Sequence, residues 1–244
     1  MYYAILADIH SNLTAFKAVL EDIEKQWGLA EIWCLGDVVG YGPDPHECIN
    51  LLQQYPHVCI AGNHDLAAAG MLDTTSLNPN AAEASNWITL HLNPSDFDYL
   101  ANLPLILQRH DFTLVHGSPR DSIWEYLTSV KGAAENMSQF DTKYCLVGHT
   151  HVPLVFEENI DGKVSHLDLP SEMSLDTDGR RLIINPGGVG QPRDGNPLAS
   201  YALFDSSENL ICHRRVAYDI ASVQERIKLV GLPLKMATRL SYGL

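Results

Sequence analysis

Basic side chains are scarce in this sequence, and their scarcity limits the partners that the protein can have. Its 244 residues include 16 lysines and arginines against 30 aspartates and glutamates, a formal net charge of −14. Such a chain repels DNA, RNA and anionic membranes, so we expect neither a nucleic-acid polymer nor a membrane as its partner. Bound cations would reverse the charge locally, so a small anionic substrate is still compatible with it.

Cysteines and long apolar runs are also in short supply. The five cysteines are odd in number and show no close paired spacing, which argues against a disulfide framework and favours a reducing cytosol. No run of about 18 apolar residues is present that could cross a membrane. The segment from Met1 to Ile9 lacks a basic start and is interrupted by Asp8, so it is not typical of a signal peptide. We therefore predict a cytoplasmic protein.

The first 61 residues alternate between strand-like and helical patterns. Short apolar runs predict buried strands, and apolar residues at a spacing of three or four predict helices between them. A β-α-β-α-β order implies parallel strands with right-handed crossovers. The expected strands are Tyr2–Ala7, Glu31–Leu35 and Val58–Ala61, and the expected helices run from Ser11 or Asn12 to about Trp27 and from Pro45 to near Tyr55.

The remainder of the chain divides into a helical and a β-rich part. Residues 66–103 look mostly helical, with turns at Asn78-Pro79 and Asn93-Pro94, whereas strands dominate from Pro153 onward. We find no internal repeat or linker, so residues 1–244 are predicted to form a single domain. The expected later elements are a hairpin of Leu105–Leu107 and Phe112–Val115, strands at Tyr144–Val147, Leu154–Glu157, Lys163–Leu169, Arg181–Ile184, Tyr201–Phe204 and Leu210–Val216, a hairpin turn at Asp161-Gly162, and a closing helix from Asp219 to Val230.

Five short blocks contain residues that bind metal ions, and most directly follow an apolar strand-like run. In open α/β sheets, ligands bind beyond the carboxyl ends of the strands, so these blocks can converge. Residues two apart in an extended segment point the same way, which lets each Asp-x-His or His-x-His pair hold one ion. The blocks are Asp8-Ile9-His10, Gly36-Asp37, Gly62-Asn63-His64-Asp65, His116-Gly117 and Gly148-His149-Thr150-His151.

Any one block alone has an ordinary structural interpretation. An isolated Asp-x-His is typical of a surface turn, and an isolated Asn-His-Asp is typical of a hydrogen-bonded turn. The order of all five blocks, each near a strand end, is what predicts a binuclear metal site. The glycines before Asp37, Asn63 and His149 would let the backbone turn sharply and approach closely there.

This pattern resembles that of the calcineurin-like metallophosphoesterase superfamily. The family pattern is Asp-x-His, Gly-Asp, Gly-Asn-His-Asp/Glu, a later His and Gly-His-x-His, and all five parts occur here between residues 8 and 151. The stretch from Asn185 to Arg193 resembles the small prokaryotic phosphoesterase branch. The resemblance implies an α/β fold: a four-layer α-β-β-α sandwich of two mixed sheets flanked by helices.

The resemblance also implies roles for the individual residues. Two divalent transition-metal ions (manganese, iron, zinc or nickel) suit such nitrogen and oxygen ligands, and a hydroxide bridging them would attack phosphorus directly. His64 would meet the phosphate and protonate the leaving oxygen, and Asp65 would orient or charge-stabilise His64. Asp8, His10 and His151 would hold the first metal, Asn63, His116 and His149 the second, and Asp37 would bridge both.

The sequence departs from one subgroup of the family. Eukaryotic-type serine/threonine phosphatases carry a phosphate-gripping arginine soon after Gly-Asp, but the run from Gly36 to Pro43 has none. Activity of that type on phosphoproteins is therefore not expected. Arg193 would substitute if its Gly/Pro loop folds over the site; the alternative is a solvated loop arginine. Tyr41, close to the bridging aspartate, would either contact the substrate or simply pack.

Two classes of function are consistent with these motifs. The first is a metal-dependent phosphoesterase acting on a small phosphorylated substrate: a phosphomonoester, a phosphodiester such as a cyclic nucleotide, or a dinucleoside polyphosphate. The second is a non-catalytic protein-interaction scaffold on the same fold. A scaffold is expected to have degraded ligand positions, whereas every ligand position is filled here, so we favour the enzyme. The sequence does not indicate the oligomeric state.

Overall fold

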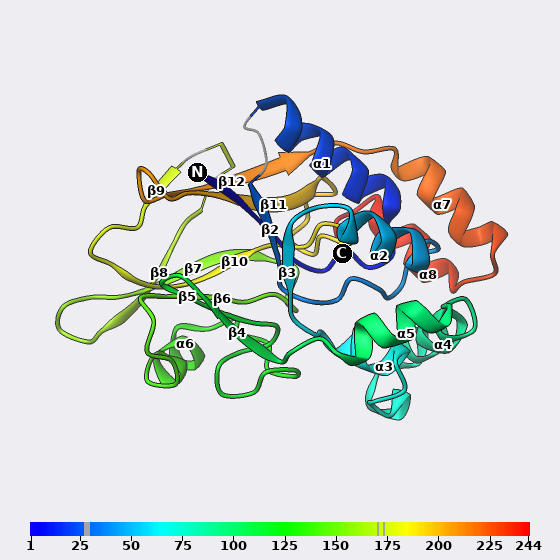
Figure 1. Cartoon of the computed structure of the whole chain (residues 1–244), viewed down its shortest axis with the longest axis horizontal. Coiled ribbons are helices and arrows are strands. Elements are labelled where there is room, and N and C mark those ends of the chain that lie inside the picture. Colours follow the sequence, from blue (N-terminus) through cyan, green and yellow to red (C-terminus); the bar gives the residue numbers. More distant parts are fainter. Residues whose placement is uncertain (27–29, 170, 173) are drawn as a thin grey trace.

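The computed structural model describes residues 1–26, 30–169, 171–172 and 174–244. These residues form two mixed sheets packed face to face and flanked by helices, which confirms the predicted four-layer α/β sandwich (Figure 1). The first sheet has the order β3 (His57–Cys59), β2 (Glu31–Cys34), β1 (Tyr2–Leu6), β11 (Ala199–Asp205), β12 (Leu210–Val216) and β9 (Ser174–Asp176). The second has the order β4 (Ile106–Arg109), β5 (Phe112–Val115), β6 (Tyr144–Leu146), β10 (Arg181–Pro186), β7 (Pro153–Glu158) and β8 (Val164–Leu167).

Helices cover both outer faces of the sandwich and gather at one of its ends. Figure 1 shows α1 on one side of the two sheets and α6 on the other, with the remaining labelled helices mostly at one end. Among the described residues, no helix is long and apolar enough to span a membrane. The helices are α1 (Leu13–Gln26), α2 (Pro45–Gln53), α3 (Asn63–Ala68), α4 (Pro79–Thr89), α5 (Pro94–Ala101), α6 (Val130–Met137), α7 (Ile220–Leu229) and α8 (Leu234–Leu240), together with a short 3₁₀ turn at Thr74–Ser76.

Alternation along β1 explains why the layers stack in this order. Successive side chains of a strand point to opposite faces of its sheet. Tyr3 and Ile5 therefore enter the core between the two sheets, whereas Ala4 and Leu6 pack on the outer side with Phe16 of α1. Helix α1 begins after Asn12, whose side-chain oxygen accepts a hydrogen bond from the Ala15 amide at 3.1 Å, as expected for a helix cap.

Several elements differ from those expected from the sequence. Helices α6 and α8 and the edge strand β9 were not predicted, and β8 is shorter than the expected Lys163–Leu169. All three missed elements are short, so hydrophobic periodicity carries little signal for them. The expected end of the first helix, about Trp27, lies outside the described residues.

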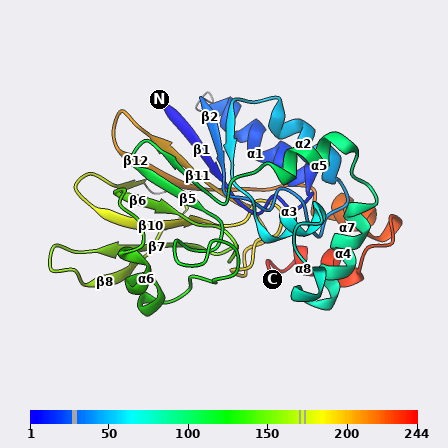
Figure 2. The same ribbon diagram turned by 60° about the horizontal axis from the view of Figure 1, so that its bottom comes forward.

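The parallel strands place the predicted ligand blocks at one edge. Strands β1, β2 and β3 run parallel to one another in the first sheet, and β5, β6 and β10 do so in the second. This confirms the predicted β-α-β-α-β opening. Figure 2 shows that the helices α3, α4, α7 and α8 lie around the end of the sandwich where the loops after these strands meet.

Candidate metal centre

The five predicted blocks converge beyond the carboxyl ends of five strands. Each begins within four residues of the end of its strand: Asp8 after β1, Asp37 after β2, Asn63 after β3, His116 after β5 and His149 after β6. All seven predicted ligands, these five with His10 and His151, are buried, with at most 3% of each residue exposed. A cluster of buried polar side chains of this size requires hydrogen-bonding or metal partners, because it costs free energy to move unpaired polar groups out of water.

Asp8, His10 and His151 form the first of two groups. The Nε2 atoms of His10 and His151 lie 3.1 Å apart, and Asp8 Oδ1 is 3.4 Å from His151 Nε2 and 3.9 Å from His10 Nε2. Their ligand atoms all lie within 4.8 Å of one another, close enough to hold one metal ion. The structure thus brings together the three residues expected at the first metal.

Hydrogen bonds on the far side of these rings determine what the facing nitrogens can do. His10 Nδ1 lies 3.1 Å from the Val39 carbonyl oxygen, and His151 Nδ1 lies 2.6 Å from the Gln191 carbonyl oxygen. Carbonyl oxygens only accept, so each Nδ1 must carry the proton of a neutral ring. The two Nε2 atoms then face each other with lone pairs, a repulsive contact that a cation between them would convert into two ligand bonds.

Asn63, His116 and His149 form the second group. His116 Nε2 lies 3.2 Å from Asn63 Oδ1 and 3.2 Å from His149 Nδ1. His116 Nδ1 is again committed to a main-chain oxygen, that of Leu35, at 2.8 Å. The ring of His149 stacks on Tyr126 with centroids 4.1 Å apart. This group contains the three residues that the resemblance places at the second metal. The expectation that His149 and His151 together hold one ion is wrong, because these two residues have left-handed rather than extended backbones and belong to different groups.

Asp37 lies between the two groups. Its Oδ2 is 3.7 Å from His10 Nε2 and 3.3 Å from His116 Nε2, and this atom has no hydrogen-bond partner among the described residues. Asp8 Oδ2 is likewise buried without such a partner. Orphaned carboxylate oxygens and facing imidazole lone pairs form a donor set that fits divalent transition-metal ions.

The site's electrostatics show strong competition between burial and local charge. Burial, reinforced by the Asp37 carboxylate, raises the pKa of Asp8 to about 7. Burial also lowers the pKa of His149 to about 3. For His116 burial acts in the same direction, but the nearby Asp37 and Asp8 carboxylates outweigh it and raise its pKa to about 10. Compensating positive charge is therefore needed around Asp37.

His64 and Asp65 do not form the pair that was expected. Both oxygens of Asp65 accept hydrogen bonds from main-chain amides: Oδ2 from Asp37 at 2.7 Å and from Gly62 at 3.0 Å, and Oδ1 from Val39 at 3.1 Å. The His64 Nδ1 atom is buried without a hydrogen-bond partner among the described residues. The predicted orientation of the His64 ring by Asp65 is therefore not observed, because Asp65 instead fastens the loop that carries Asp37. The alternative, that the charge of Asp65 stabilises His64, stays a prediction.

Many site residues have a strained backbone. Five of the predicted ligands adopt left-handed conformations, with φ between 50° and 64°, a region that residues other than glycine seldom occupy. Such strain costs on the order of 1–3 kcal/mol per residue and clusters where function requires it. The five are Asp8, His10, Asp37, His149 and His151.

Tyr41 and Arg193 lie beside the first group. The buried Tyr41 ring contacts the rings of His10 and His64, with centroids 4.6 and 4.4 Å away. The Arg193 guanidinium carbon lies 5.6 Å from the Tyr41 ring centroid, and its Nη2 donates to Gln191 Oε1 at 2.9 Å. The Gly/Pro loop after β10 thus brings Arg193 to the rim of the site rather than into open solvent.

Sequence reasoning missed several residues that shape this centre. Three of them, Leu35, Val39 and Gln191, act through main-chain carbonyl oxygens, for which a sequence carries no side-chain signal. Tyr126 stacks on a predicted ligand, but it comes from the irregular loop between β5 and α6, which has no periodic pattern.

Comparison with known proteins shows which family the chain belongs to. The sequence profile of the calcineurin-like phosphoesterase superfamily domain matches residues 1–209. The chain belongs to the calcineurin-like phosphoesterase superfamily. An uncharacterized protein from Methanocaldococcus jannaschii is 36% identical over 245 residues, covering 98% of this chain and 97% of the relative.

More distant superfamily relatives are named for an activity. The symmetrical bis(5'-nucleosyl)-tetraphosphatase of Vibrio cholerae is 27% identical over 139 residues, covering 54% of this chain and 49% of that protein. The match thus spans about half the length of that tetraphosphatase.

Solved structures of the superfamily include one very similar chain. A metallophosphoesterase from Sphaerobacter thermophilus has a TM-score of 0.91 and 43% identity and covers 100% of this chain and 99% of its own. A hypothetical protein from Pyrococcus horikoshii shares the fold, with a TM-score of 0.82, 24% identity and coverage of 100% and 98%.

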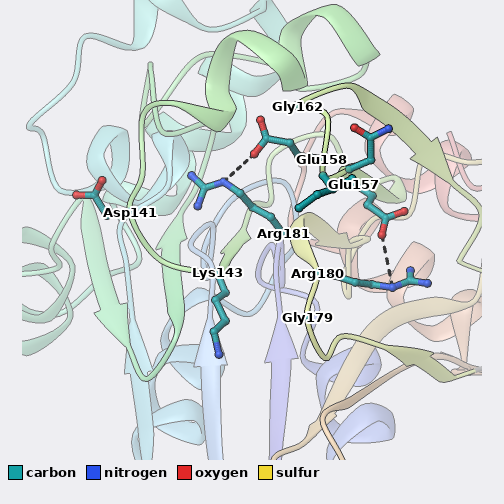
Figure 3. Close-up of a pocket in the computed structure, with 10 residues that line it drawn as sticks. Asp141, Lys143, Glu157, Glu158, Gly162, Gly179, Arg180 and Arg181 are labelled. Atoms are coloured by element: carbon teal, nitrogen blue, oxygen red, sulfur yellow. Dashed lines mark ion pairs between the residues drawn. The ribbon is translucent and has the colours of Figure 1, made fainter.

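A wide depression elsewhere in this phosphoesterase-superfamily chain lacks comparable chemistry. It has a volume of about 710 Å³ and lies where β6 and β10 begin, opposite the strand ends that carry the ligands. Both of its arginines are paired with glutamates, Arg180 with Glu157 at 3.5 Å and Arg181 with Glu158 at 3.1 Å (Figure 3). Size alone therefore does not mark the functional site.

Proposed function

We propose that this chain is a metal-dependent phosphoesterase that hydrolyses a small phosphorylated substrate. The observation that carries the proposal is the convergence of imidazole nitrogens and orphaned carboxylate oxygens on either side of Asp37. We assign two divalent transition-metal ions to it, one with Asp8, His10 and His151 and one with Asn63, His116 and His149. Ions held there supply Lewis-acid polarisation of a phosphoryl group and acidify water.

His64 is the proposed proton donor to the leaving oxygen. Burial lowers its pKa to about 4, so the ring is neutral at pH 7 before substrate binds. An anionic phosphate beside the ring favours its charged form and raises this pKa toward the working pH. The main-chain amide of His64 donates to Asp37 Oδ1 at 2.9 Å. This hydrogen bond fixes the position of His64 relative to Asp37, the proposed bridging ligand.

Arg193 and Tyr41 are the proposed substrate contacts at the rim. The planar guanidinium of arginine matches phosphate oxygens, and Arg193 is held over Tyr41 with its buried Nε atom lacking a hydrogen-bond partner among the described residues. Tyr41 supports both Arg193 and the His64 ring. In this assignment Asp65 positions the Asp37 loop and does not touch the substrate.

The name of the Vibrio cholerae relative supports nucleotide-like substrates. The candidates are phosphomonoesters, phosphodiesters and dinucleoside polyphosphates. A purely non-catalytic scaffold is the second candidate function, and the complete ligand set argues against it.

A hydrolysis panel tests the proposal. Hydrolysis by the purified protein would be measured with nitrophenyl phosphate, bis-nitrophenyl phosphate, a cyclic nucleotide and a dinucleoside tetraphosphate. Manganese, nickel and zinc would be supplied in separate assays. We expect turnover of at least one substrate with at least one metal. No turnover of any substrate with any metal, by folded and metal-loaded protein, would leave the scaffold as the better function.

A further inference from the structure

Two arginines differ from all the others in their charge environment. The sequence contains nine arginines, and seven of them form an ion pair with a carboxylate of the chain. The two without an aspartate or glutamate partner among the described residues are Arg193 and Arg239. In a chain with a net charge of −14, acidic partners are plentiful, so this pair calls for an explanation. The seven are Arg109, Arg120, Arg180, Arg181, Arg214, Arg215 and Arg226.

The structure brings Arg239 to the same rim as Arg193. Arg239 belongs to α8, and its neighbour Leu240 packs in one cluster with Tyr41, the ring over which Arg193 lies. A cavity of only about 10 Å³ remains between α7 and α8 on one side and the His10 and Tyr41 walls of the site on the other.

The segment after α8 is also tied to the loop that carries Arg193. The Gly195 amide donates to the Gly243 carbonyl oxygen at 2.9 Å. A side chain at Gly243 would meet the Asn196 backbone at 2.6 Å, so the two segments are in direct contact. Arg193 and Arg239 are therefore carried by two segments that support each other.

The Arg239 guanidinium is positioned to accept an anion. Its Nε donates to the Leu244 main-chain oxygen, and its two NH₂ groups have no hydrogen-bond partner among the described residues. Burial, followed by repulsion from Arg193, lowers the pKa of Arg239 to about 10, so it stays charged at neutral pH. Two half-buried like charges repel, and an anion with several oxygens between them would relieve that repulsion.

We propose that Arg239 is a second phosphate-binding residue and that the substrate carries at least two linked phosphates. This rests on the proposed phosphoesterase function, in which the phosphoryl group that reacts lies at Asp37 with Arg193 beside it. The adjacent phosphate of the same molecule then meets Arg239. The substrate class is a phosphoanhydride, such as a nucleoside or dinucleoside polyphosphate, rather than a compound with an isolated phosphate.

A binding experiment tests Arg239 without requiring turnover. Methylenediphosphonate carries two linked phosphonates that cannot be hydrolysed, and methylphosphonate carries one. With manganese in excess, calorimetry should show that the parent protein binds methylenediphosphonate at least tenfold more tightly than methylphosphonate, which is a ratio of affinities of ten or more. Arg239→Ala should reduce that ratio by about tenfold, and Lys235→Ala, which removes an exposed charge from the same helix, should leave it unchanged.

A parallel kinetic comparison separates this inference from the proposed function. Arg239→Ala should lower kcat/KM for a dinucleoside tetraphosphate about tenfold or more and change that for nitrophenyl phosphate less than twofold. If neither the parent nor any variant hydrolysed the substrates, but the parent still preferred the diphosphonate and Arg239→Ala reduced that preference, the phosphoesterase function would be contradicted and the role of Arg239 supported. Equal affinity of the parent for both phosphonates, or a ratio unchanged by Arg239→Ala, would overturn the role of Arg239.

Discussion

Three histidines of the candidate centre already use one ring nitrogen before any ligand binds. His10, His116 and His151 each direct Nδ1 to a main-chain carbonyl oxygen, which leaves Nε2 as the atom that faces the site. Partners of this kind fix the tautomer and ring orientation of metal-binding histidines. His64 has no such carbonyl partner among the described residues, so at the scale of single residues we expect its substitution to affect catalysis without affecting metal binding.

His64→Ala should lower turnover but leave the metals in place. Protonation of a leaving oxygen is worth roughly 10²–10⁴-fold in rate, and good leaving groups need it less. We expect a large loss on an alkyl phosphate and a much smaller one on nitrophenyl phosphate, measured with metal content in the same preparations. An equal loss on both substrates would mean that His64 binds phosphate instead, and loss of metal would make it a ligand.

Asp37→Asn should reduce metal content more than any other single ligand change. Asp37 Oδ2 is the atom that approaches a histidine of each group, and the amide removes its negative charge. Metal analysis after gel filtration would compare it with Asn63→Ala, which should disturb only the second group. If Asn63→Ala lost both ions while Asp37→Asn kept both, the bridging role of Asp37 would be wrong.

At the scale of elements, the loops after parallel strands hold the site through close backbone packing. Gly36 has φ +88°, and a Cβ at Gly62 would meet Asp37 Oδ1 at 2.0 Å. These two positions satisfy the expectation that the glycines before the ligands allow sharp turns and close approach. Asp65 adds three hydrogen bonds to main-chain amides of the same loops.

Gly62→Ala should therefore damage both stability and metal binding. Forcing a methyl group against the Asp37 carboxylate should lower the free energy of unfolding by about 1–3 kcal/mol, a typical overpacking cost. Gly132→Ala is a matched control, because its Cβ would meet only movable side-chain atoms of Leu127 and Ser129 at 3.3 Å. Urea unfolding and metal analysis measure both effects, and indistinguishable variants would contradict this role of Gly62.

The hairpin of β11 and β12 should confer a pH dependence on stability. Burial, with Arg215 nearby, lowers the pKa of His213 to about 4, and its Nε2 lies 2.8 Å from Ser200 Oγ. The unfolded chain, with a histidine pKa of about 6.5, then binds the proton first as the pH falls. The contribution of His213 to the free energy of unfolding, up to about 3 kcal/mol, should be fully present above about pH 6.5 and should be lost as the pH falls toward 4.

Comparison with His213→Gln isolates this contribution. Glutamine can donate to Ser200 Oγ but does not titrate, so urea unfolding at pH 7 and pH 5 should show a smaller difference than in the parent. Equal differences in both proteins would show that His213 does not contribute to the pH dependence.

The sequence predicted which residues come together better than it predicted their surroundings. Strand-end blocks such as Gly148 to His151 contain side chains that bind metal ions, so seven candidate ligands could be named before their convergence was known. The hydrogen-bond partners of Asp65 could not be named from the sequence, because the main-chain amides of Asp37 and Val39 approach its side chain only in the folded chain. Arg239 was missed for a similar reason: α8 is short, and its position at the rim depends on tertiary packing.

At the scale of the whole molecule, two sheets direct their parallel strand ends to one edge, and the helices there close around it. Seven candidate ligands from both sheets therefore meet at a place that neither sheet could form alone. The formation of a single domain by residues 1–244 stays a prediction.

Metal stoichiometry, measured together with the effect of chelation, tests the binuclear centre most directly. Protein purified with manganese, iron, zinc or nickel in excess and then desalted should contain close to two ions per chain by elemental analysis. A chelator should remove the ions and abolish phosphate-ester hydrolysis, and re-addition of a divalent transition metal should restore it. A folded protein that bound no ions under these conditions, and whose hydrolysis the chelator left unchanged, would contradict the metal centre built on Asp37.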